Sequence, residues 1–231
     1  TLPRNGGISV LDFPLRGKLV EVFEKSGSDF AELEKALYLQ DGPYANPYDL
    51  VTFYDNHDMA RMNATDAGFI DANNWLFTAR GIPAIYYGSE TGFMRGRAEH
   101  AGNRNYYGQE RVEAGKQHAI HRDLTRIARL RRDSPALQRG LQFNLRLKGD
   151  EAAFYRVYEH AGANQTALVL LNKGDAQKRM QVSDYLQAGE WRDAFSGERI
   201  QAGELLELEV PAHGVRVLFF DQPLSRPDLR A

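Results

Sequence analysis

The sequence has no cysteine among its 231 residues. Disulfide scaffolds, thiol catalysts and cysteine-ligated metal sites are therefore excluded, while the redox compartment stays open. Long apolar runs are also missing. The longest runs, such as residues 166–171, fall far short of the roughly 20 residues that a membrane-spanning helix needs. We therefore predict a chain without a membrane-spanning helix and with no membrane partner.

An excess of charge of either sign is missing as well. The 29 basic residues nearly balance the 31 acidic residues, so the formal net charge is -2. This balance gives no electrostatic reason to expect nucleic acid or an anionic membrane as a partner. The first seven residues contain neither Met nor a basic segment followed by an apolar one, so no secretion signal can be recognised. We expect the chain to start at an interior point of a longer protein.

The first 135 residues show alternating strand and helix patterns. Such alternation predicts a parallel sheet. Pro14 stands at a position where the first turn of a helix tolerates proline, and we expect Leu15, Leu19, Val22 and Phe23 to face inward. Ser28 is the expected N-cap of the second helix. The predicted strands are residues 8–13, 50–54 and 84–88, and the predicted helices are residues 14–25, 29–39, 71–80 and 109–132.

The pattern changes to a period of two after Pro135. Leu141, Phe143, Leu145 and Leu147 alternate with polar residues, as in a strand with one buried face. Further strands are predicted at residues 154–158, 166–171, 205–210 and 215–220. With turn signals between them, they predict an antiparallel Greek-key β-sandwich over residues 136–222. The last nine residues, 223–231, are expected to form a tail.

Three strands are too few for a closed barrel of eight parallel strands, which takes about 250 residues. Two interpretations of residues 1–135 remain. They form either a small open α/β unit or the last part of a (β/α)8 barrel whose beginning precedes Thr1. The residues at the ends of the predicted strands distinguish these interpretations.

Four polar residues, Asp55, Asn56, His57 and Asp58, follow the predicted strand 50–54. Parallel sheets and barrels place their chemistry at this end of a strand. An Asp-rich turn that caps the next helix explains the same residues equally well. The segment 81–90, taken alone, favours a packed strand over a site.

Two motifs together resemble the α-amylase superfamily of glycoside hydrolases. FYDNHD at 53–58 looks like the motif on that family's seventh barrel strand, and GIPAIYYGSE at 81–90 looks like the eighth-strand motif. ISVLDF at 8–13 resembles the sixth strand, and residues 136–222, which close with PAHGVRVL, are similar to the sandwich that follows these barrels. DNHDMAR at 55–61 and the later Asn103-Arg104 are most similar to cyclodextrin glucanotransferases and related maltodextrin-active enzymes.

The resemblance implies a role for each matching residue. Asp58 would be the third carboxylate of the family, which stabilises the transition state, and His57 would donate hydrogen bonds to the sugar. Asn56 and Arg104 would also bind substrate, although a surface arginine is nearly as good an explanation of Arg104. The nucleophile and the acid/base belong to the family's fourth and fifth strands, which would precede Thr1. The chain by itself is therefore predicted to be inactive.

Other polar residues receive no catalytic role. Glu90 matches a residue at the barrel rim, and Glu99 is interpreted as a solvated loop charge. His118 and His121 are three residues apart, but no carboxylate has matching spacing, so structural histidines are the favoured interpretation. No metal and no cofactor is assigned to this chain. By resemblance, calcium would belong to the part that precedes it.

The predicted function is that of the C-terminal part of a retaining glycosidase or transglycosidase acting on α-1,4-glucans. The resemblance at residues 58–61 and at Arg104 favours a transferase, whereas His100 stands where the most similar relatives carry aspartate. The alternatives are a non-catalytic carbohydrate-binding or accessory relative of the same fold, and an independent small α/β binding protein. The expected partners are an α-glucan and the preceding barrel segment. By resemblance, the complete protein would be periplasmic or secreted.

Overall fold

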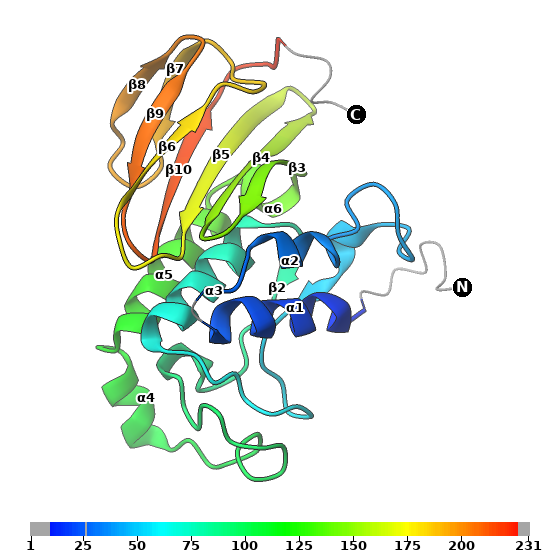
Figure 1. Ribbon diagram of the computed structural model, residues 1–231, viewed down its shortest axis with the longest axis vertical. Helices are drawn as coiled ribbons and strands as arrows, with labels where there is room; N and C mark the ends of the chain where they lie inside the picture. The colour runs from blue at the N-terminus through cyan, green and yellow to red at the C-terminus, as the bar shows by residue number, and fades with distance from the viewer. Residues whose placement is uncertain (1–9, 26, 226–231) are drawn as a thin grey trace.

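Helices and short parallel strands form one layer of the structure, and a β-sandwich packs on it (Figure 1). The computed structural model describes residues 10–25 and 27–225. Within these residues no helix combines the length and apolar character needed to cross a bilayer. The elements of the first layer are α1 (Phe13–Glu24), α2 (Ala31–Glu34), η1 (Pro47–Asp49), β1 (Val51–Thr52), α3 (Asp66–Thr78), β2 (Ile82–Pro83), η2 (Ser89–Thr91), α4 (Gln109–Gly115), α5 (Ala119–Arg132) and α6 (Pro135–Arg139).

Side-chain caps determine where the main helices begin. The Asp12 carboxylate accepts a hydrogen bond from the Leu15 amide at 3.1 Å, and Pro14 occupies the first turn of α1. Thr65 caps α3 in the same way through the Gly68 amide. Such caps satisfy amide groups that have no partner inside the helix. The predicted inward face of α1 is confirmed, because its four predicted apolar residues are buried.

The parallel strands are shorter than the sequence predicts. Leu11 forms a single parallel bridge with Val51, and β1 pairs in parallel with β2. Ile82 and Ala84 donate to the carbonyls of Leu50 and Thr52, both at 2.8 Å. Only alternate residues donate toward one neighbour, so Pro83, which has no amide hydrogen, fits between the two donors. The described residues contain no closed barrel, and the incomplete barrel stays a prediction.

Two predicted strands are wrong in extent. The strand predicted at 84–88 is observed two residues earlier, at 82–83. For the strand predicted at 8–13, residues 8 and 9 lie outside the described residues, and Phe13 already belongs to α1.

Two of the predicted helices are also wrong in extent, and a third starts earlier than predicted. The helix predicted at 29–39 ends after one turn, in α2, and the backbone is left-handed at Tyr38, with φ of 49°. Asp29, and not Ser28, accepts the hydrogen bond at its start, from the Ala31 amide. The helix predicted at 109–132 is two helices, with His118 as the N-cap of the second. The helix predicted at 71–80 starts at Asp66.

The second half is antiparallel, as the sequence predicts. A six-stranded sheet has the order β3-β4-β5-β10-β7-β8, and β6 pairs with β9. Strands β6, β7 and β8 have no counterpart among the predicted strands, and the Greek-key connection stays a prediction. The strands are β3 (Leu141–Lys148), β4 (Glu151–His160), β5 (Ala163–Asn172), β6 (Lys178–Val182), β7 (Gly189–Asp193), β8 (Arg199–Ala202), β9 (Leu206–Val210) and β10 (Gly214–Phe220).

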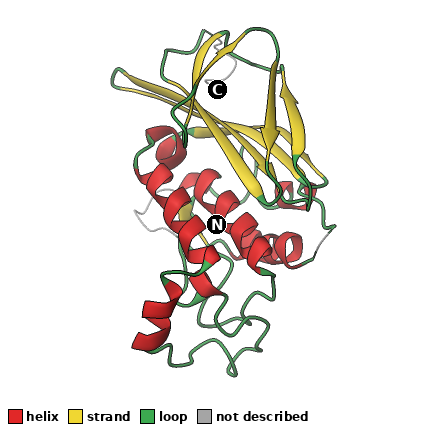
Figure 2. Cartoon of the chain, turned by 90° about the vertical axis from the view of Figure 1, so that its left-hand side faces the viewer, coloured by secondary structure: helices red, strands yellow, loops and turns green. Residues whose placement is uncertain are grey.

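The large sheet has a hydrophobic core on each face. Along β5, Val169 and Leu171 face the helices, whereas Leu168 and Leu170 face the strand pair β6-β9. Figure 2 shows the helices stacked against one side of the sheet. Because both faces are covered, the middle of these strands is mostly apolar on both faces, and Arg156 of β4 is a buried exception. The predicted division into residues 1–135, 136–222 and 223–231 stays a prediction.

A β-bulge changes the pattern of β3. The register with β4 shifts between Asn144 and Arg146, so Leu147 packs with the helices while Phe143 packs in the outer core. A strict period of two would place both on one face. The predicted alternation of β3 is therefore wrong at its first residues as well: Leu141 is exposed and Gln142 is buried.

The buried side chain of Arg80 joins distant parts of the chain. Its guanidinium donates to the Asp12 carboxylate at 2.5 Å and to the carbonyls of Ala36 at 2.8 Å and Leu37 at 2.9 Å. Its backbone amide donates to the Gln142 side chain on β3. Arg80 and Asp12 are both essentially inaccessible to solvent. This one residue therefore links the start of α1, the loop after α2 and the edge of the sheet.

We expect Arg80→Met to lower the free energy of unfolding by about 3–5 kcal/mol, because it removes the counter-charge of the buried Asp12 carboxylate and the donor to two carbonyls. Arg139→Met, at an exposed position, is the control and should change it by less than about 0.5 kcal/mol. Urea unfolding followed by circular dichroism measures both. Equal stability of the two variants would contradict the linking role of Arg80.

A histidine of the sandwich is paired with a buried carboxylate of α3. His213 Nδ1 lies 2.7 Å from Asp71 Oδ2, and its Nε2 lies 2.9 Å from Asp175 Oδ1. Burial raises the pKa of Asp71 to about 7, against the opposing effect of His213, with Asp123 of α5 adding to the rise and Lys173 reducing it. Although burial opposes it, the pKa of His213 is raised by its hydrogen bonds to the two carboxylates. The folded pair therefore holds protons more tightly than the unfolded chain.

This pairing predicts that stability falls with rising pH. Groups whose pKa is raised on folding contribute stability that is lost as the pH rises through the folded pKa, here from about pH 4 to above 7. We expect the urea midpoint to decrease between pH 6 and pH 8.5, and to decrease less in Asp71→Asn, which cannot ionise. If the urea midpoint changed equally with pH in the wild type and in Asp71→Asn, the Asp71-His213 pair would not control the pH dependence of stability.

Candidate functional site

The candidate site is built by the loops that follow β1 and β2. In Figure 1 these loops lie at the end of the molecule opposite the β-sandwich. The first loop carries the predicted residues Asn56, His57 and Asp58, and the second reaches Asn103 and Arg104. Asn103 donates a hydrogen bond to His57 and Arg104 donates one to Asp58, so residues 46 positions apart in the sequence are in direct contact. The parallel pairing of β1 with β2 places both loops at the same edge.

Three of the predicted residues form one cluster. Arg104 Nη2 donates to Asp58 Oδ1 at 2.9 Å, and His57 Nε2 lies 3.2 Å from Asp58 Oδ2. The side chains of His57, Asp58 and Arg104 are 52%, 56% and 64% exposed. The cluster therefore presents a carboxylate, an imidazole and a guanidinium to solvent, where all three can hydrogen-bond to the hydroxyl groups of a ligand.

Asn56 has a different position from the other three. Its side-chain oxygen accepts a hydrogen bond from the Asp58 amide at 3.0 Å, which closes the turn. Its Nδ2 is buried and has no hydrogen-bond partner within the described part of the chain. Asn56 thus shapes the turn, and its predicted contact with substrate stays a prediction.

Asn103 supports the cluster from the interior of the protein. It is fully buried, and its Nδ2 donates to the His57 carbonyl at 2.6 Å. Its Oδ1 accepts from the His100 amide at 3.2 Å. One amide group therefore holds the backbone of His57 and the loop that carries Arg104. The sequence indicates Asn103 only as the neighbour of Arg104.

A buried arginine organises the second loop. Arg61 donates to the carbonyls of Gly102 at 2.6 Å and Tyr87 at 3.0 Å. Its guanidinium lies 4.8 Å and 4.9 Å from the ring centroids of Tyr86 and Tyr87, a distance at which cation-π attraction operates. Sequence reasoning included Arg61 in a motif but missed this role, because its partners lie 25 or more positions away.

Asp55 connects the two loops inside the protein. Its Oδ1 accepts from the Met62 amide and its Oδ2 from the Ser89 hydroxyl, both at 2.7 Å. Burial raises the pKa of Asp55, although both hydrogen bonds oppose the rise. Asp55 is buried, so it positions the site and does not face a ligand.

The polar residues without a predicted catalytic role have other positions. Glu99 contacts His100 at 3.3 Å on the surface, and Glu90 belongs to η2. His118 caps α5 by accepting from the Ile120 amide, in agreement with its predicted structural role. Across residues 10–25 and 27–225, no three His, Cys, Asp or Glu residues are grouped so that they could hold a metal ion.

Comparison with known proteins relates this geometry to a family. No family model matches the chain. A cyclomaltodextrin glucanotransferase of Bacillus sp. (strain 38-2) is 31% identical over 171 residues, which cover 72% of this chain and 22% of that protein. An α-amylase of Niallia circulans is 31% identical over 170 residues, with coverage of 72% and 30%. The chain is homologous to cyclomaltodextrin glucanotransferases and α-amylases.

Solved structures of the α-amylase family have the same fold. A cyclomaltodextrin glucanotransferase with a three-domain ABC distribution superposes with a TM-score of 0.73 at 28% identity, over 95% of this chain and 46% of that chain. An α-amylase from Geobacillus thermoleovorans, complexed with acarbose, gives a TM-score of 0.76 at 23% identity, over 92% and 48%. The chain thus spans less than a third of these curated relatives and about half of these solved homologues.

We expect Asp55→Ala to destabilise the protein by about 2–5 kcal/mol, because the Met62 amide and the Ser89 hydroxyl each lose their acceptor. Asp55→Asn keeps an oxygen for one of them and should cost less than half as much. Urea unfolding measures both variants, with Asp49→Ala as the exposed control. An Asp55→Ala protein as stable as the control would contradict the connecting role of Asp55.

Proposed function

We propose that this chain is the C-terminal part of an enzyme that cleaves or transfers α-1,4-glucans by a retaining mechanism. The His57-Asp58-Arg104 cluster supports the proposal most directly, because it is exposed and its two loops are held by buried contacts. In this proposal residues 1–135 are the last part of a (β/α)8 barrel, and the Greek-key sandwich follows it. The homology to glucanotransferases and amylases agrees with this substrate class.

Asp58 would act as the carboxylate that stabilises the transition state. Retaining glycosidases use two carboxyl groups about 5 Å apart as nucleophile and acid/base, with a charged, ring-distorted transition state. In the proposal both groups belong to the segment that precedes this chain. Asp58 would then accept hydrogen bonds from sugar hydroxyls, and His57 would donate one that strengthens as charge develops.

Arg104 would have one role in the free site and another in the ligand-bound site. Its ion pair with Asp58 orients the carboxylate, and its five donors can bind sugar hydroxyls when a ligand enters. The pair is exposed, so its own contribution to stability is at most about 1 kcal/mol and a ligand can displace it at low cost. This readily exchanged contact suits a site that alternates between free and ligand-bound states.

The substrate and the reaction follow from the same proposal. Solved structures of related fold contain acarbose, maltotriose and maltose, so an α-glucan oligosaccharide is the proposed ligand. We propose maltodextrins of modest length and a substantial transfer reaction. Calcium binding by the preceding segment stays a prediction. A periplasmic or secreted location of the complete protein stays a prediction as well. A non-catalytic carbohydrate-binding relative is the second candidate, because the cluster can bind sugar without the two missing carboxylates.

The complete protein, extended upstream of Thr1, provides the test. We expect Asp58→Asn to lower kcat far more than it changes KM, and His57→Ala to lower kcat by about 10²- to 10³-fold, as for the loss of one transition-state hydrogen-bond donor. Incubation with maltotriose followed by chromatography measures turnover and shows products longer than the substrate if transfer occurs.

Two controls complete this experiment. Glu99→Gln, an exposed carboxylate of the second loop, should leave kcat within about twofold of the wild type. The isolated 231-residue chain should release no reducing sugar from starch. Activity of the isolated chain that Asp58→Ala abolishes would overturn the division of the catalytic groups. A complete protein that binds maltotriose but does not convert it would favour the binding relative.

A further inference from the structure

Helix α1 holds the first loop of the candidate site at both ends of the loop. Arg16, near the start of the helix, donates from Nε to the Tyr54 carbonyl at 3.1 Å and from Nη2 to the Ala60 carbonyl at 3.0 Å. Within residues 10–25 and 27–225, neither carbonyl accepts a hydrogen bond from a backbone amide. The two carbonyls stand on either side of residues 55–59. One guanidinium therefore bridges the two ends of the segment that carries the site.

The other end of α1 contacts the same part of the chain. Glu24, the last residue of the helix, accepts a hydrogen bond from the Asn63 amide at 2.6 Å through Oε1. Burial lowers the pKa of Arg16, whereas the carboxylates of Asp55 and Glu24 oppose this change. The Arg16 cation therefore lies near two opposite charges, one in the loop and one on its own helix.

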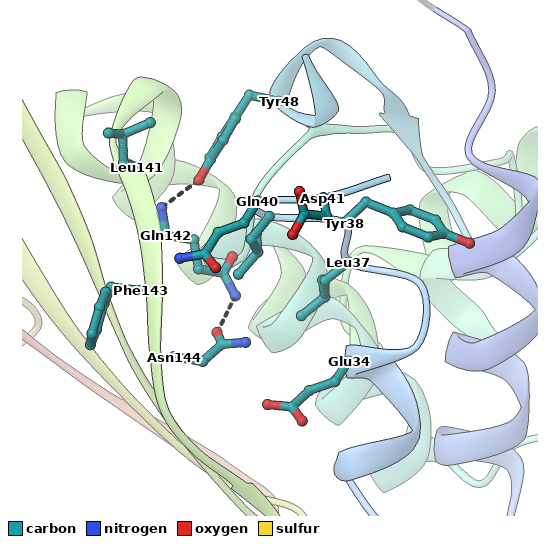
Figure 3. Close-up of a pocket in the computed structure, with 11 residues that line it drawn as sticks. Glu34, Leu37, Tyr38, Gln40, Asp41, Tyr48, Leu141, Gln142, Phe143 and Asn144 are labelled. Atoms are coloured by element: carbon teal, nitrogen blue, oxygen red, sulfur yellow. Dashed lines mark hydrogen bonds between the residues drawn. The ribbon is translucent and has the colours of Figure 1, made fainter. Parts of the chain in front are cut away.

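Helix α1 is itself fixed from the side of the sandwich. Its N-cap, Asp12, pairs with the buried Arg80, whose backbone amide donates to the Gln142 side chain of β3. The Gln142 backbone amide donates to the Tyr48 hydroxyl at 2.8 Å, and its side chain donates to Asn144 at 2.9 Å (Figure 3). Buried polar groups that are paired in this way rigidify the elements that they join. We therefore expect α1 to be a rigid support for the loop.

We propose that Arg16 is a positioning residue of the site, which holds the loop so that His57 and Asp58 keep the orientation that the reaction needs. This inference rests on the proposed function, in which both side chains act on the transition state. Arg16 acts through two backbone carbonyls and does not touch the substrate. Its planar guanidinium suits this task because its donors have a fixed spacing, whereas a lysine carries a single point charge on a flexible stem.

Kinetics of the complete protein on maltotriose test the proposal. Because a shift of about 1 Å in a reacting group can lower a rate by about 10²-fold, we expect a loss of kcat of this size in Arg16→Ala. KM should change by less than about threefold, since the loop acts mainly on the transition state. Arg16→Lys should have a kcat between those of the wild type and Arg16→Ala. Millimolar guanidinium should restore part of the kcat of Arg16→Ala, and sodium chloride at equal ionic strength should not.

Two variants of the same helix are the controls. Lys18→Ala removes a cation that pairs with Glu21 and Glu32 and should leave kcat unchanged. Leu19→Ala opens a cavity in the core and should lower Tm at least as much as Arg16→Ala, yet leave kcat per folded molecule nearly unchanged. An equal loss of kcat in Leu19→Ala and Arg16→Ala would overturn the positioning role. A loss in Arg16→Ala that neither Arg16→Lys nor guanidinium recovers would overturn it too.

Hydrogen exchange in the 231-residue chain separates this inference from the proposed function. The amides of residues 55–63 should exchange about tenfold faster in Arg16→Ala than in Leu19→Ala, because the loop is released at both of its ends. Equal exchange of this segment in the two variants would overturn the positioning role, whatever the activity of the complete protein. A complete protein that does not convert maltotriose would overturn the proposed function, and faster exchange in Arg16→Ala would then still support the contact of Arg16 with the loop.

Discussion

The carbonyl groups at the end of α3 are the constraint on which the arrangement of the two layers depends. The last carbonyls of a helix have no partner within it, and here they are buried between the helices and the sheet. Arg156 of β4 donates to the Thr78 carbonyl at 2.7 Å, and Arg131 of α5 donates to the carbonyls of Phe77, Ala79 and Gly81. Burial lowers the pKa of Arg131 to about 10 and that of Arg156 to about 9. The cost of burying these cations is offset by carbonyl dipoles at the negative end of the helix.

This junction also controls the candidate site. Gly81, whose carbonyl Arg131 binds, has φ of 98° and immediately precedes β2. A side chain at this position would meet Thr52 of β1 at 2.5 Å, so the close contact of the two strands needs glycine. Since the site loops leave from β1 and β2, their relative position follows from how the end of α3 is held. Arg156 of the sandwich therefore contacts the end of α3, while the site loops lie at the opposite end of the molecule (Figure 2).

The candidate cluster combines exposed side chains with a buried support. His57, Asp58 and Arg104 are exposed, whereas the buried side chain of Asn103 fixes the backbone of His57. The side chains of the cluster can therefore exchange water for a ligand while their backbone stays in place. The relatives that share this chain's sequence are glucanotransferases and amylases.

The sequence by itself determined the features that depend on neighbouring residues. Apolar residues at helical spacing predicted the buried face of α1, and short apolar runs between turn signals predicted the long strands β4, β5 and β10, because each pattern is complete within one element. The motif at 55–58 indicated a candidate site, whose role stays a prediction. Tertiary structure decided the rest. The early end of α2, the bulge in β3, and the contacts of Arg61 and Asn103 depend on partners tens of residues away, and no local pattern encodes which buried polar groups will meet.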